Sequence, residues 1–350
     1  MQPAASAERA PNREARFVID QGHPLTVAAQ HDVWTLKQPF VISRGSKSVA
    51  DVVVATITDG RHTGRGEAVP YQRYGETVDT ALAAIRSARL TDRNALQRQM
   101  PAGAARNALD CALWDLEAKQ RATTVARLAT AGLSTGDLRP LLTAFTISLA
   151  APSDMAAAAR AVPGLPLLKL KLGGNGDPER MRAVRAARPD ARLMADANEA
   201  WTADMLQPFL AAAAEAGIEL IEQPLPAGAD DALLSLPQPH KIMICADESV
   251  HTADDLSKLG SRYSAVNIKL DKAGGLTAAR DLWQAASAQG FKTMIGSMVS
   301  SSLAVAPAFI LAQQADWVDL DGPLLLAQDR PHGFVIKAGV MSPPSHELWG

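Results

Sequence analysis

The feature that most constrains this 350-residue chain is a repeat of short apolar segments, each ending near a polar residue. They cover residues 142–148, 167–172, 192–197, 219–223, 241–247, 266–270, 292–296 and 317–320, with alanine-rich helical stretches between them. The polar residues are Thr146, Lys171, Asp196, Glu222, Asp247, Lys269, Ser297 and Asp319, separated by 22 to 28 residues. Eight strand and helix units of this length predict a (β/α)₈-type barrel, a modified TIM barrel.

The rest of the chain predicts a smaller α+β unit. Residues 51–58 are β-branched and end at an Asp-Gly turn signal, residues 77–89 and 103–121 have helical spacing, and 42–48 read as a polar loop. We expect a capping domain at 25–138, a barrel at 139–325 and a C-terminal return at 326–350, in which 333–337 form a strand against the capping domain. An open dinucleotide-binding sheet is disfavoured because its glycine-rich phosphate loop is missing after the first strand.

Composition excludes several classes of function. The 35 basic and 37 acidic side chains form no like-charged block and aromatics are 5% of residues, so we expect no nucleic-acid partner. No apolar run approaches the roughly 20 residues of a membrane helix, so we expect no membrane contact. Cys111 and Cys245 suit a reducing compartment, and we predict a cytoplasmic protein. Residues 1–24 are expected to be a disordered tail.

Lys169 and Lys171 stand two residues apart in the apolar run 167–172. Side chains alternate along a strand, so both lysines should point to the same face. Because buried ammonium groups are costly, solvated lysines on an edge strand are the ordinary explanation for such a pair. The polar residues that follow at regular intervals favour a buried site instead.

Three acids, Asp196, Glu222 and Asp247, end three successive predicted strands. Active sites of TIM barrels lie at the C-terminal ends of the strands, where these carboxylates would converge. Taken singly, each acid is better explained as a helix N-cap. Taken together, they would repel one another unless a cation lay between them, and an all-oxygen ligand set favours Mg²⁺, with Mn²⁺ as the alternative.

Lys171 ends the second predicted strand and Lys269 the sixth, so they would face each other across the barrel mouth. A substrate carboxylate on the metal would place its α-carbon between them. One lysine, whose pKa cationic neighbours would lower, would remove a proton, and the other would return one to the opposite face, which inverts the stereocentre. Lys169 would stabilise the negative charge that develops, and Asp271 would orient Lys269.

The motifs are Lys169-x-Lys171, Asp196-x-Asn198, Glu222-Gln223-Pro224, Asp247-Glu248-Ser249 and Lys269-x-Asp271-Lys272. Over about residues 25–350, the chain resembles the enolase superfamily, in its muconate-lactonizing subgroup. Lysine on the sixth strand identifies the subgroup. A mandelate-racemase-like member would instead carry a catalytic histidine at the seventh strand, where this chain has Gly296-Ser297-Met298. Asp319-Leu320-Asp321-Gly322-Pro323 and the Arg44-Gly45-Ser46 loop are similar to those of dipeptide epimerases.

The resemblance implies a Mg²⁺-dependent epimerase that acts by 1,1-proton transfer on the Glu residue of L-Ala-D/L-Glu, in murein peptide recycling. The resemblance also implies that Lys171 acts on the R epimer and Lys269 on the S epimer. Asp319 and Asp321 would hold the dipeptide ammonium, and Arg44 would hold the side-chain carboxylate. Thr146 and Met298 would line the pocket, and Asn198 would support the site. A pair of acids on one face does suit a cation. Alone, the Asp319 and Asp321 pair also fits a polar strand end, and Arg44 a solvated arginine.

Other functions remain open on the sequence. A dipeptide epimerase of different specificity, an o-succinylbenzoate synthase or a cycloisomerase could use the same scaffold. A non-catalytic barrel that binds metal and dipeptide belongs to another class, which the two intact lysines disfavour. The sequence sets neither the dipeptide preference nor the oligomeric state, and a homo-oligomer is compatible with it.

Overall fold

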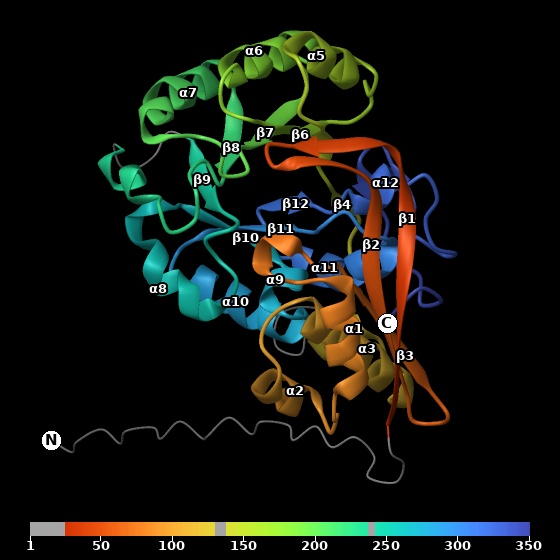
Figure 1. Cartoon of the computed structure of the whole chain (residues 1–350). Coiled ribbons are helices and arrows are strands. Elements are labelled where there is room, and N and C mark those ends of the chain that lie inside the picture. Colours follow the sequence, from red (N-terminus) through yellow and green to blue (C-terminus); the bar gives the residue numbers. More distant parts are fainter. Residues whose placement is uncertain (1–24, 130–137, 237–241) are drawn as a thin grey trace, which may run out of the picture.

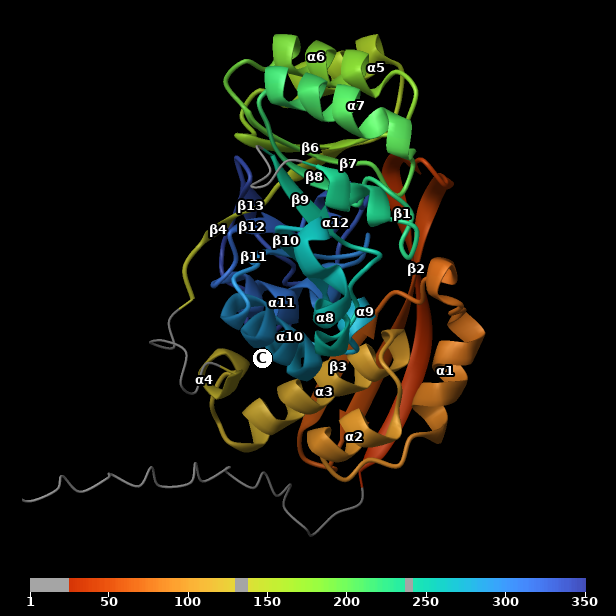
Figure 2. The same cartoon turned by 90° about the vertical axis from the view of Figure 1, so that its left-hand side faces the viewer.

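The computed structural model describes residues 25–129, 138–236 and 242–350, so the expected N-terminal tail lies outside the described residues. An N-terminal α+β unit stands against a barrel of parallel strands, with its long hairpin reaching the barrel mouth (Figures 1 and 2). Within these described ranges, no helix combines the length and apolar character needed to cross a bilayer.

Eight parallel strands follow one another around the barrel in chain order. They are β5 (Phe145–Ile147), β6 (Leu167–Lys171), β7 (Arg192–Asp196), β8 (Ile218–Glu222), β9 (Met243–Ala246), β10 (Ala265–Lys269), β11 (Lys292–Gly296) and β12 (Trp317–Asp319). Between the first and the last, Ala144 N donates to Val318 O at 2.9 Å. The predicted (β/α)₈-type fold with an N-terminal α+β unit is confirmed, and every polar residue used to count the barrel lies at or next to a strand end.

Helices cover the outside of the barrel, since their apolar faces pack on the strands. They are α5 (Pro152–Arg160), α6 (Asp177–Ala187), α7 (Ala203–Glu215), η2 (Asp231–Ser235), η3 (Ala253–Asp255), α8 (Leu256–Leu259), η4 (Gly260–Arg262), α9 (Leu270–Ala273), α10 (Leu276–Ala288), α11 (Ser302–Ala312) and α12 (Gly322–Leu325). After β8 the described crossover contains only the short η2, which makes this a modified barrel. The predicted strand 241–247 begins at a residue outside the described part.

Two predictions are wrong, one about the first barrel strand and one about the C-terminal return. The expected strand 142–148 is divided: β4 (Leu141–Leu142) leaves the barrel to pair with β14 (Val340–Met341), and only β5 joins the barrel. The strand expected at 333–337 is β13 (Ile336–Lys337), which pairs with β14 rather than with the N-terminal sheet. The chain end does contact the N-terminal unit, where Gly350 N donates to Asp115 Oδ1 at 2.9 Å.

The N-terminal unit is a three-stranded antiparallel sheet covered by helices. Its elements are β1 (Thr26–Ile42), β2 (Gly45–Thr58), β3 (Thr63–Ala68), η1 (Gln72–Tyr74), α1 (Val78–Ser87), α2 (Arg93–Gln99), α3 (Ala104–Gln120) and α4 (Val125–Ala129). The loop expected at 42–48 is instead the tip of the β1–β2 hairpin, because Ile42 pairs with Gly45 and only Ser43 and Arg44 form the turn. This extension carries the hairpin tip over the barrel mouth.

Helix α3 is buried along most of its length because it lies between the β-sheet and the barrel helices. Glycines at alternate positions of β3 allow the close approach. A Cβ at Gly66 would lie 2.2 Å from Ala108 O, and one at Gly64 would lie 2.0 Å from Ala112 O. Backbone of α3 therefore packs directly on backbone of β3.

Gly66→Ala is expected to lower the free energy of unfolding by about 3 kcal/mol, the upper range for overpacking. The added methyl group would meet a helix carbonyl oxygen that cannot turn aside. Urea denaturation measures the change. Gly164→Ala is the control, since a Cβ there meets nothing within 4 Å. Equal stability of the two variants would contradict the close packing.

Candidate active site

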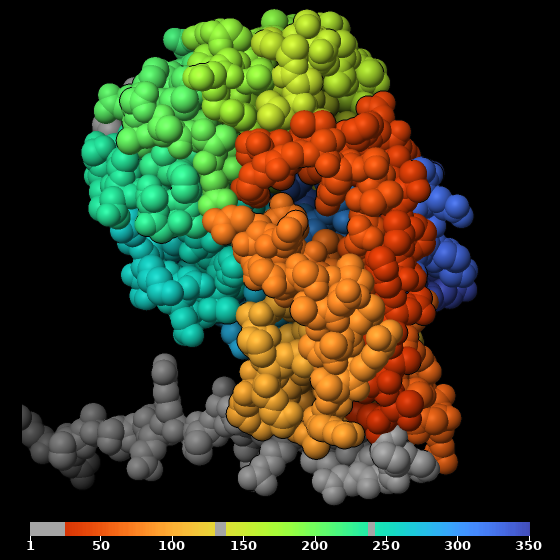
Figure 3. All heavy atoms as spheres, in the orientation of Figure 1, coloured from red at the N-terminus to blue at the C-terminus, as the bar shows by residue number. Residues whose placement is uncertain are grey.

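A cavity of about 490 Å³ lies at the C-terminal ends of the barrel strands, beneath the N-terminal unit. Lys171 and Lys269 line its barrel side, and the hairpin tip and the η1 segment line its roof. Figure 3 shows an opening framed by the red hairpin and the orange segment of the N-terminal unit. This end of the barrel is the one where TIM-barrel enzymes bind their substrates.

Strand β6 directs Lys169 and Lys171 into the barrel, as their spacing predicts. Lys169 is the deeper, at 1% exposed, and its Nζ lies 2.6 Å from both Glu222 Oε2 and Asp319 Oδ2. Lys171 reaches the cavity, and its Nζ lies 2.5 Å from Asp196 Oδ2. Burial alone would lower the pKa of Lys169, but the neighbouring carboxylates raise it well above its ordinary value. Direct ion pairing explains why these lysines can be buried.

The three acids predicted to bind a metal lie on β7, on β8 and directly after β9, alternating with ammonium groups. Lys169 Nζ lies 3.5 Å from Asp196 Oδ2 and 2.6 Å from Glu222 Oε2. Lys269 Nζ lies 3.8 Å from Glu222 Oε1 and 2.6 Å from Asp247 Oδ2. Among the described residues, no three His, Cys, Asp or Glu side chains are grouped closely enough to hold a metal ion as they stand. The predicted convergence is therefore a row of carboxylates bridged by lysines.

The chemistry of this donor set fits a hard cation. Burial, and next the Asp196 carboxylate, raise the pKa of Glu222 to about 7. Burial would also raise the pKa of Asp196, but Lys171 and Lys169 lower it to about 2. The shift of Glu222 means that the lysines do not fully offset the mutual repulsion of the buried acids. A divalent cation with oxygen ligands would relieve that repulsion.

Each acid is also held by another polar side chain. Asn198, expected to support the site, donates to Asp196 through its backbone N at 2.9 Å and through Nδ2 at 3.1 Å. Asn267 Nδ2 donates to Glu222 Oε1 at 2.7 Å. The buried Lys272 donates to Asp247 Oδ1 at 2.6 Å. These contacts fix the orientation of the carboxylates.

The pKa of Lys269 differs from the expectation of a lowered value. Burial would lower it, but the carboxylates of Asp247 and Glu222 raise it well above its ordinary range. The prediction considered only the cationic neighbours, whereas the acids here point at the ammonium itself. Lys269 is 7% exposed and, like Lys171, lines the cavity. The strands β7, β8 and β9 separate the two lysines around the barrel.

Asp271 does not orient Lys269, contrary to our expectation. Strand β10 ends at Lys269 and α9 begins at once, so the two-residue alternation stops there. The Asp271 carboxylate instead accepts hydrogen bonds from Val69 N at 2.9 Å and Asn107 Nδ2 at 3.0 Å. It joins the barrel to the N-terminal unit, and Asp247 contacts Lys269 in its place.

Asp271→Asn should flatten the pH dependence of stability. Burial raises the pKa of Asp271 to about 7, so the folded chain binds this proton more tightly than the unfolded chain does. The parent should therefore lose stability as the pH rises from about 4 to about 7, by an amount on the order of 4 kcal/mol, and the variant should not. Urea denaturation at several pH values measures this, with the exposed Asp254→Asn as control. Equal slopes for parent and variant would refute the assignment.

The residues expected to bind an ammonium, Asp319 and Asp321, are buried and are not part of the cavity lining. Asp319 Oδ2 accepts from Lys169, whereas its Oδ1 is buried without a hydrogen-bond partner among the described residues. Asp321 Oδ2 accepts from Thr146 N at 2.7 Å. Burial, and next Asp319, raise the pKa of Asp321 to about 7. Met298 lines the cavity, as expected, whereas Thr146 does not.

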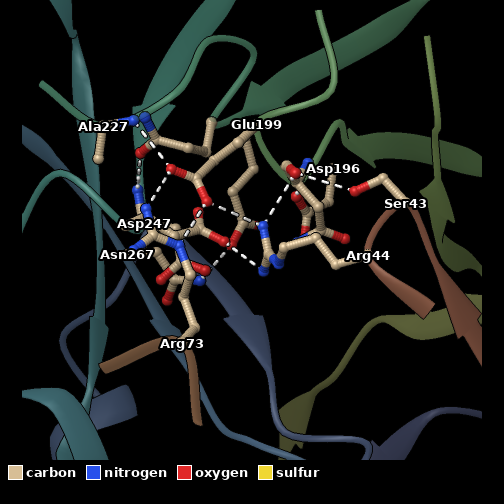
Figure 4. A network of polar contacts seen from close by, with 12 residues as sticks. Ser43, Arg44, Arg73, Asp196, Glu199, Ala227, Asp247 and Asn267 are labelled. Carbon is tan, nitrogen blue, oxygen red and sulfur yellow. Dashed lines mark hydrogen bonds and ion pairs between the residues drawn. The ribbon is translucent and has the colours of Figure 1, made fainter. Parts of the chain in front are cut away.

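Arg44 lines the cavity from the hairpin tip, but other groups already bind its guanidinium (Figure 4). It donates to Glu248 at 2.7 Å, to Glu199 at 3.1 Å and to Asn198 O at 2.9 Å. Glu199 also accepts from Arg73 of η1 at 2.9 Å and from Ala227 N at 2.9 Å. Glu199 thus ties both roof segments to the barrel.

Sequence reasoning missed several residues that join this roof to the barrel. Glu199 and Glu248 directly follow Asn198 and Asp247, so their place just past a strand end was a usable signal. Arg73 and Tyr74 stand in a loop whose contact with the barrel is purely tertiary. Tyr74 packs on His251 with ring centroids 4.5 Å apart. No local pattern could have predicted that contact.

A barrel with buried acids and lysines beneath an α+β roof defines a (β/α)₈-type enzyme with its site at the strand ends. Residues 25–129 match the mandelate racemase / muconate lactonizing enzyme N-terminal domain model, and residues 154–347 match the enolase C-terminal domain-like model. The chain belongs to the enolase superfamily. Its curated relatives are racemases and epimerases, and it is an isomerase.

Two relatives and two solved structures are informative. The chain is 45% identical to L-Ala-D/L-Glu epimerase of Escherichia coli (87% of this chain, 95% of that protein) and 44% identical to N-acetyl-D-glutamate racemase of Pseudoalteromonas sp (85% and 95%). An enolase family member from Agrobacterium tumefaciens, solved with sodium and L-Ala-L-Glu, has TM-score 0.90 and 49% identity (93% and 100% covered). A dipeptide epimerase from Cytophaga hutchinsonii, solved with Mg and D-Ala-L-Val, has TM-score 0.84 and 26% identity (92% and 94% covered).

Proposed function

We propose that this isomerase interconverts L-Ala-D-Glu and L-Ala-L-Glu by 1,1-proton transfer at the α-carbon of the glutamate residue. The observation that carries the proposal is the placement of Lys171 and Lys269 on strands separated by β7, β8 and β9, lining one cavity. The likeness to the Escherichia coli epimerase and to the structure that holds L-Ala-L-Glu supports the substrate. By family resemblance, the reaction belongs to murein peptide recycling in the cytoplasm, which stays a prediction.

We assign Asp196, Glu222 and Asp247 as the ligands of a Mg²⁺ ion, and the choice of ion is supported by the dipeptide epimerase from Cytophaga hutchinsonii, which was solved with Mg. When bound, the cation supplies positive charge that stabilises the negative charge developing on the substrate carboxylate. Lys169, buried and cationic, adds fixed positive charge beside the same acids. The protein's own part is to hold this charge in place and to exclude water.

The two cavity lysines carry the proton. Lys171 is assigned to the α-proton of the R epimer and Lys269 to that of the S epimer. A lysine removes a proton only when neutral and returns one only when charged, so the two must start each turnover in opposite states. A proton leaves one face of the α-carbon and another arrives at the opposite face, which inverts its configuration. Arg44, Thr146 and Met298 remain proposed substrate contacts.

The acids of strand β12 and its following turn supply the proposed contact to the dipeptide ammonium. Asp319 Oδ1 is buried without a hydrogen-bond donor among the described residues, and burial, followed by the Asp319 carboxylate, raises the pKa of Asp321. An incoming ammonium would satisfy the first acid and stabilise the charged form of the second. This contact would let the enzyme discriminate between a dipeptide and a substrate that has no amino group.

A second candidate is racemisation of an N-acylated glutamate, favoured by the 44% identical N-acetyl-D-glutamate racemase. Such a substrate has the same reacting carbon and side-chain carboxylate, but it lacks the ammonium. The same lysines would serve it. The two substrates therefore differ at the Asp319 and Asp321 contact and not at the proton-transfer site.

Proton NMR in D₂O tests the proposal directly. The parent enzyme with Mg²⁺ should replace the glutamate α-proton of L-Ala-L-Glu by deuterium and produce the D-Glu epimer. N-acetyl-L-glutamate, tested alongside, should react at least about tenfold more slowly, the effect of losing one charge-assisted contact. Absence of Mg²⁺-dependent exchange from the dipeptide would reject the proposal, and a preference for N-acetyl-glutamate would favour the second candidate.

Glu199→Gln should raise KM for L-Ala-L-Glu about tenfold, with a smaller change in kcat. The amide cannot keep the charge-assisted bonds that Glu199 accepts from Arg44 and Arg73, so the cavity roof would lose its anchor. Steady-state kinetics by polarimetry measures both constants. The matched control is Glu215→Gln, whose carboxylate pairs with Arg182 on the exposed outer surface. An unchanged KM would show that the roof needs no such anchor.

A further inference from the structure

The cavity is lined by five cationic side chains, and four of them are already neutralised. They are Arg44, Lys47, Arg73, Lys171 and Lys269. Arg44 pairs with Glu248, Arg73 with Glu199, Lys171 with Asp196 and Lys269 with Asp247, all within 2.9 Å. Lys47 makes no ion pair with any carboxylate of the described residues. The carboxylate that most favours its charged form, Asp51, lies 2.8 Å from His31 instead.

The hairpin brings Lys47 into the same cavity as Lys171 and Lys269. Lys47 pairs across the strands with Phe40, and both side chains line the cavity. The Nζ atoms of Lys47 and Lys171 lie 5.8 Å and 5.7 Å from the centroid of that same ring. A ring face is a weak partner compared with a carboxylate. Burial, and next the Lys171 ammonium, lower the pKa of Lys47 to about 8. The site therefore has an uncompensated cation facing its interior.

We propose that Lys47 binds the side-chain carboxylate of the substrate's glutamyl residue and so selects acidic substrates. This inference rests on the proposed function and adds the residue that determines its specificity. Arg44, which the family resemblance suggests for this task, would have to give up Glu248 and Glu199 to perform it. Lys47 has no carboxylate partner to give up among the described side chains. Its place beside Lys171 puts the anion close to the reacting carbon.

The test compares L-Ala-L-Glu with the uncharged, near-isosteric L-Ala-L-Gln. Parent, Lys47→Met and Lys47→Arg are assayed with Mg²⁺ for α-proton exchange in D₂O. Lys47→Met should lower the ratio of kcat/KM between the two dipeptides about 30-fold, mainly through KM for L-Ala-L-Glu, as expected for one charge-assisted hydrogen bond. Lys47→Arg should restore at least part of the ratio, because it restores the charge.

Lys337→Met is the matched control, since Lys337 is an exposed lysine on β13 far along the chain from the hairpin. It should leave the ratio at the parent value. An unchanged ratio in Lys47→Met, or an equal loss for both dipeptides, would overturn the role of Lys47. A parent enzyme that shows no preference for L-Ala-L-Glu would instead overturn the glutamate substrate of the proposed function. Thermal unfolding of Lys47→Met confirms that a folded protein is compared.

Discussion

Lys269→Ala and Lys171→Ala should each lower epimerisation of L-Ala-D/L-Glu by at least about 10³-fold. Inversion needs one group to remove a proton and another to deliver one, and a positioned acid or base is worth about 10² to 10⁴ in rate. The two amines lie on β6 and β10 and line the same cavity, so neither can take over the other's face. Polarimetry of each purified variant with Mg²⁺ measures the loss.

Isotope exchange tests which lysine acts on which face of the α-carbon. With Lys171 intact, Lys269→Ala should still exchange the α-proton of the R epimer with deuterium, without inversion. Lys171→Ala should do the same only for the S epimer. Lys258→Ala, at an exposed lysine whose side chain pairs with Asp255, should behave as the parent. If either single variant exchanged both epimers at similar rates, the two lysines could not serve opposite faces.

The barrel and the inner site could be predicted from the sequence because they follow from local periodicity. Alternation along a strand placed Lys169 and Lys171 on one face, and the strand spacing brought Asp196, Glu222 and Asp247 to neighbouring strand ends. These positions are set by backbone geometry within each unit. Long-range information was needed only to know that the units close into a ring.

The roof could not be predicted in the same way. Arg44 meets Glu199 and Glu248 across more than 150 residues of chain, and no pattern near Arg44 indicates these partners. The prediction that Asp271 orients Lys269 is wrong for a different reason. Helix α9 begins directly after Lys269, so the alternation of side chains along β10 does not extend to Asp271. The division of the first predicted strand depends on β14, nearly 200 residues further on. Each miss is thus a tertiary contact overriding a local pattern.

Charge state was the least predictable property. The sequence places a lysine beside acids but does not say which acid its ammonium will meet. Lys269 meets Asp247 at 2.6 Å, which raises its pKa where repulsion from other cations was expected to lower it. The sign of such a shift depends on ångström distances inside a medium of low dielectric constant.

Glu222→Gln should abolish both Mg²⁺ binding and α-proton exchange. Glu222 is buried between Asp196 and Asp247, and burial with their negative charge raises its pKa to about 7, which makes it the acid with most to gain from a cation. Removing its charge should cost several kcal/mol of transition-state stabilisation, at least about 10³-fold in exchange rate. Isothermal titration calorimetry with MgCl₂ measures binding without reference to activity.

Thermal unfolding supplies the second readout for Glu222→Gln. A ligand at a hundred times its Kd stabilises the folded parent by about 2.7 kcal/mol, and this gain should vanish in the variant. Glu219→Gln is the control, because Glu219 lies near the opposite end of the same strand β8, where its partly exposed carboxylate pairs with Arg192 and accepts a hydrogen bond from Trp317. It should keep the Mg²⁺-dependent rise in unfolding temperature. A Glu222→Gln protein that still bound Mg²⁺ with parental affinity would show that the cation lies elsewhere, and the three acids would then serve only as partners of the lysines.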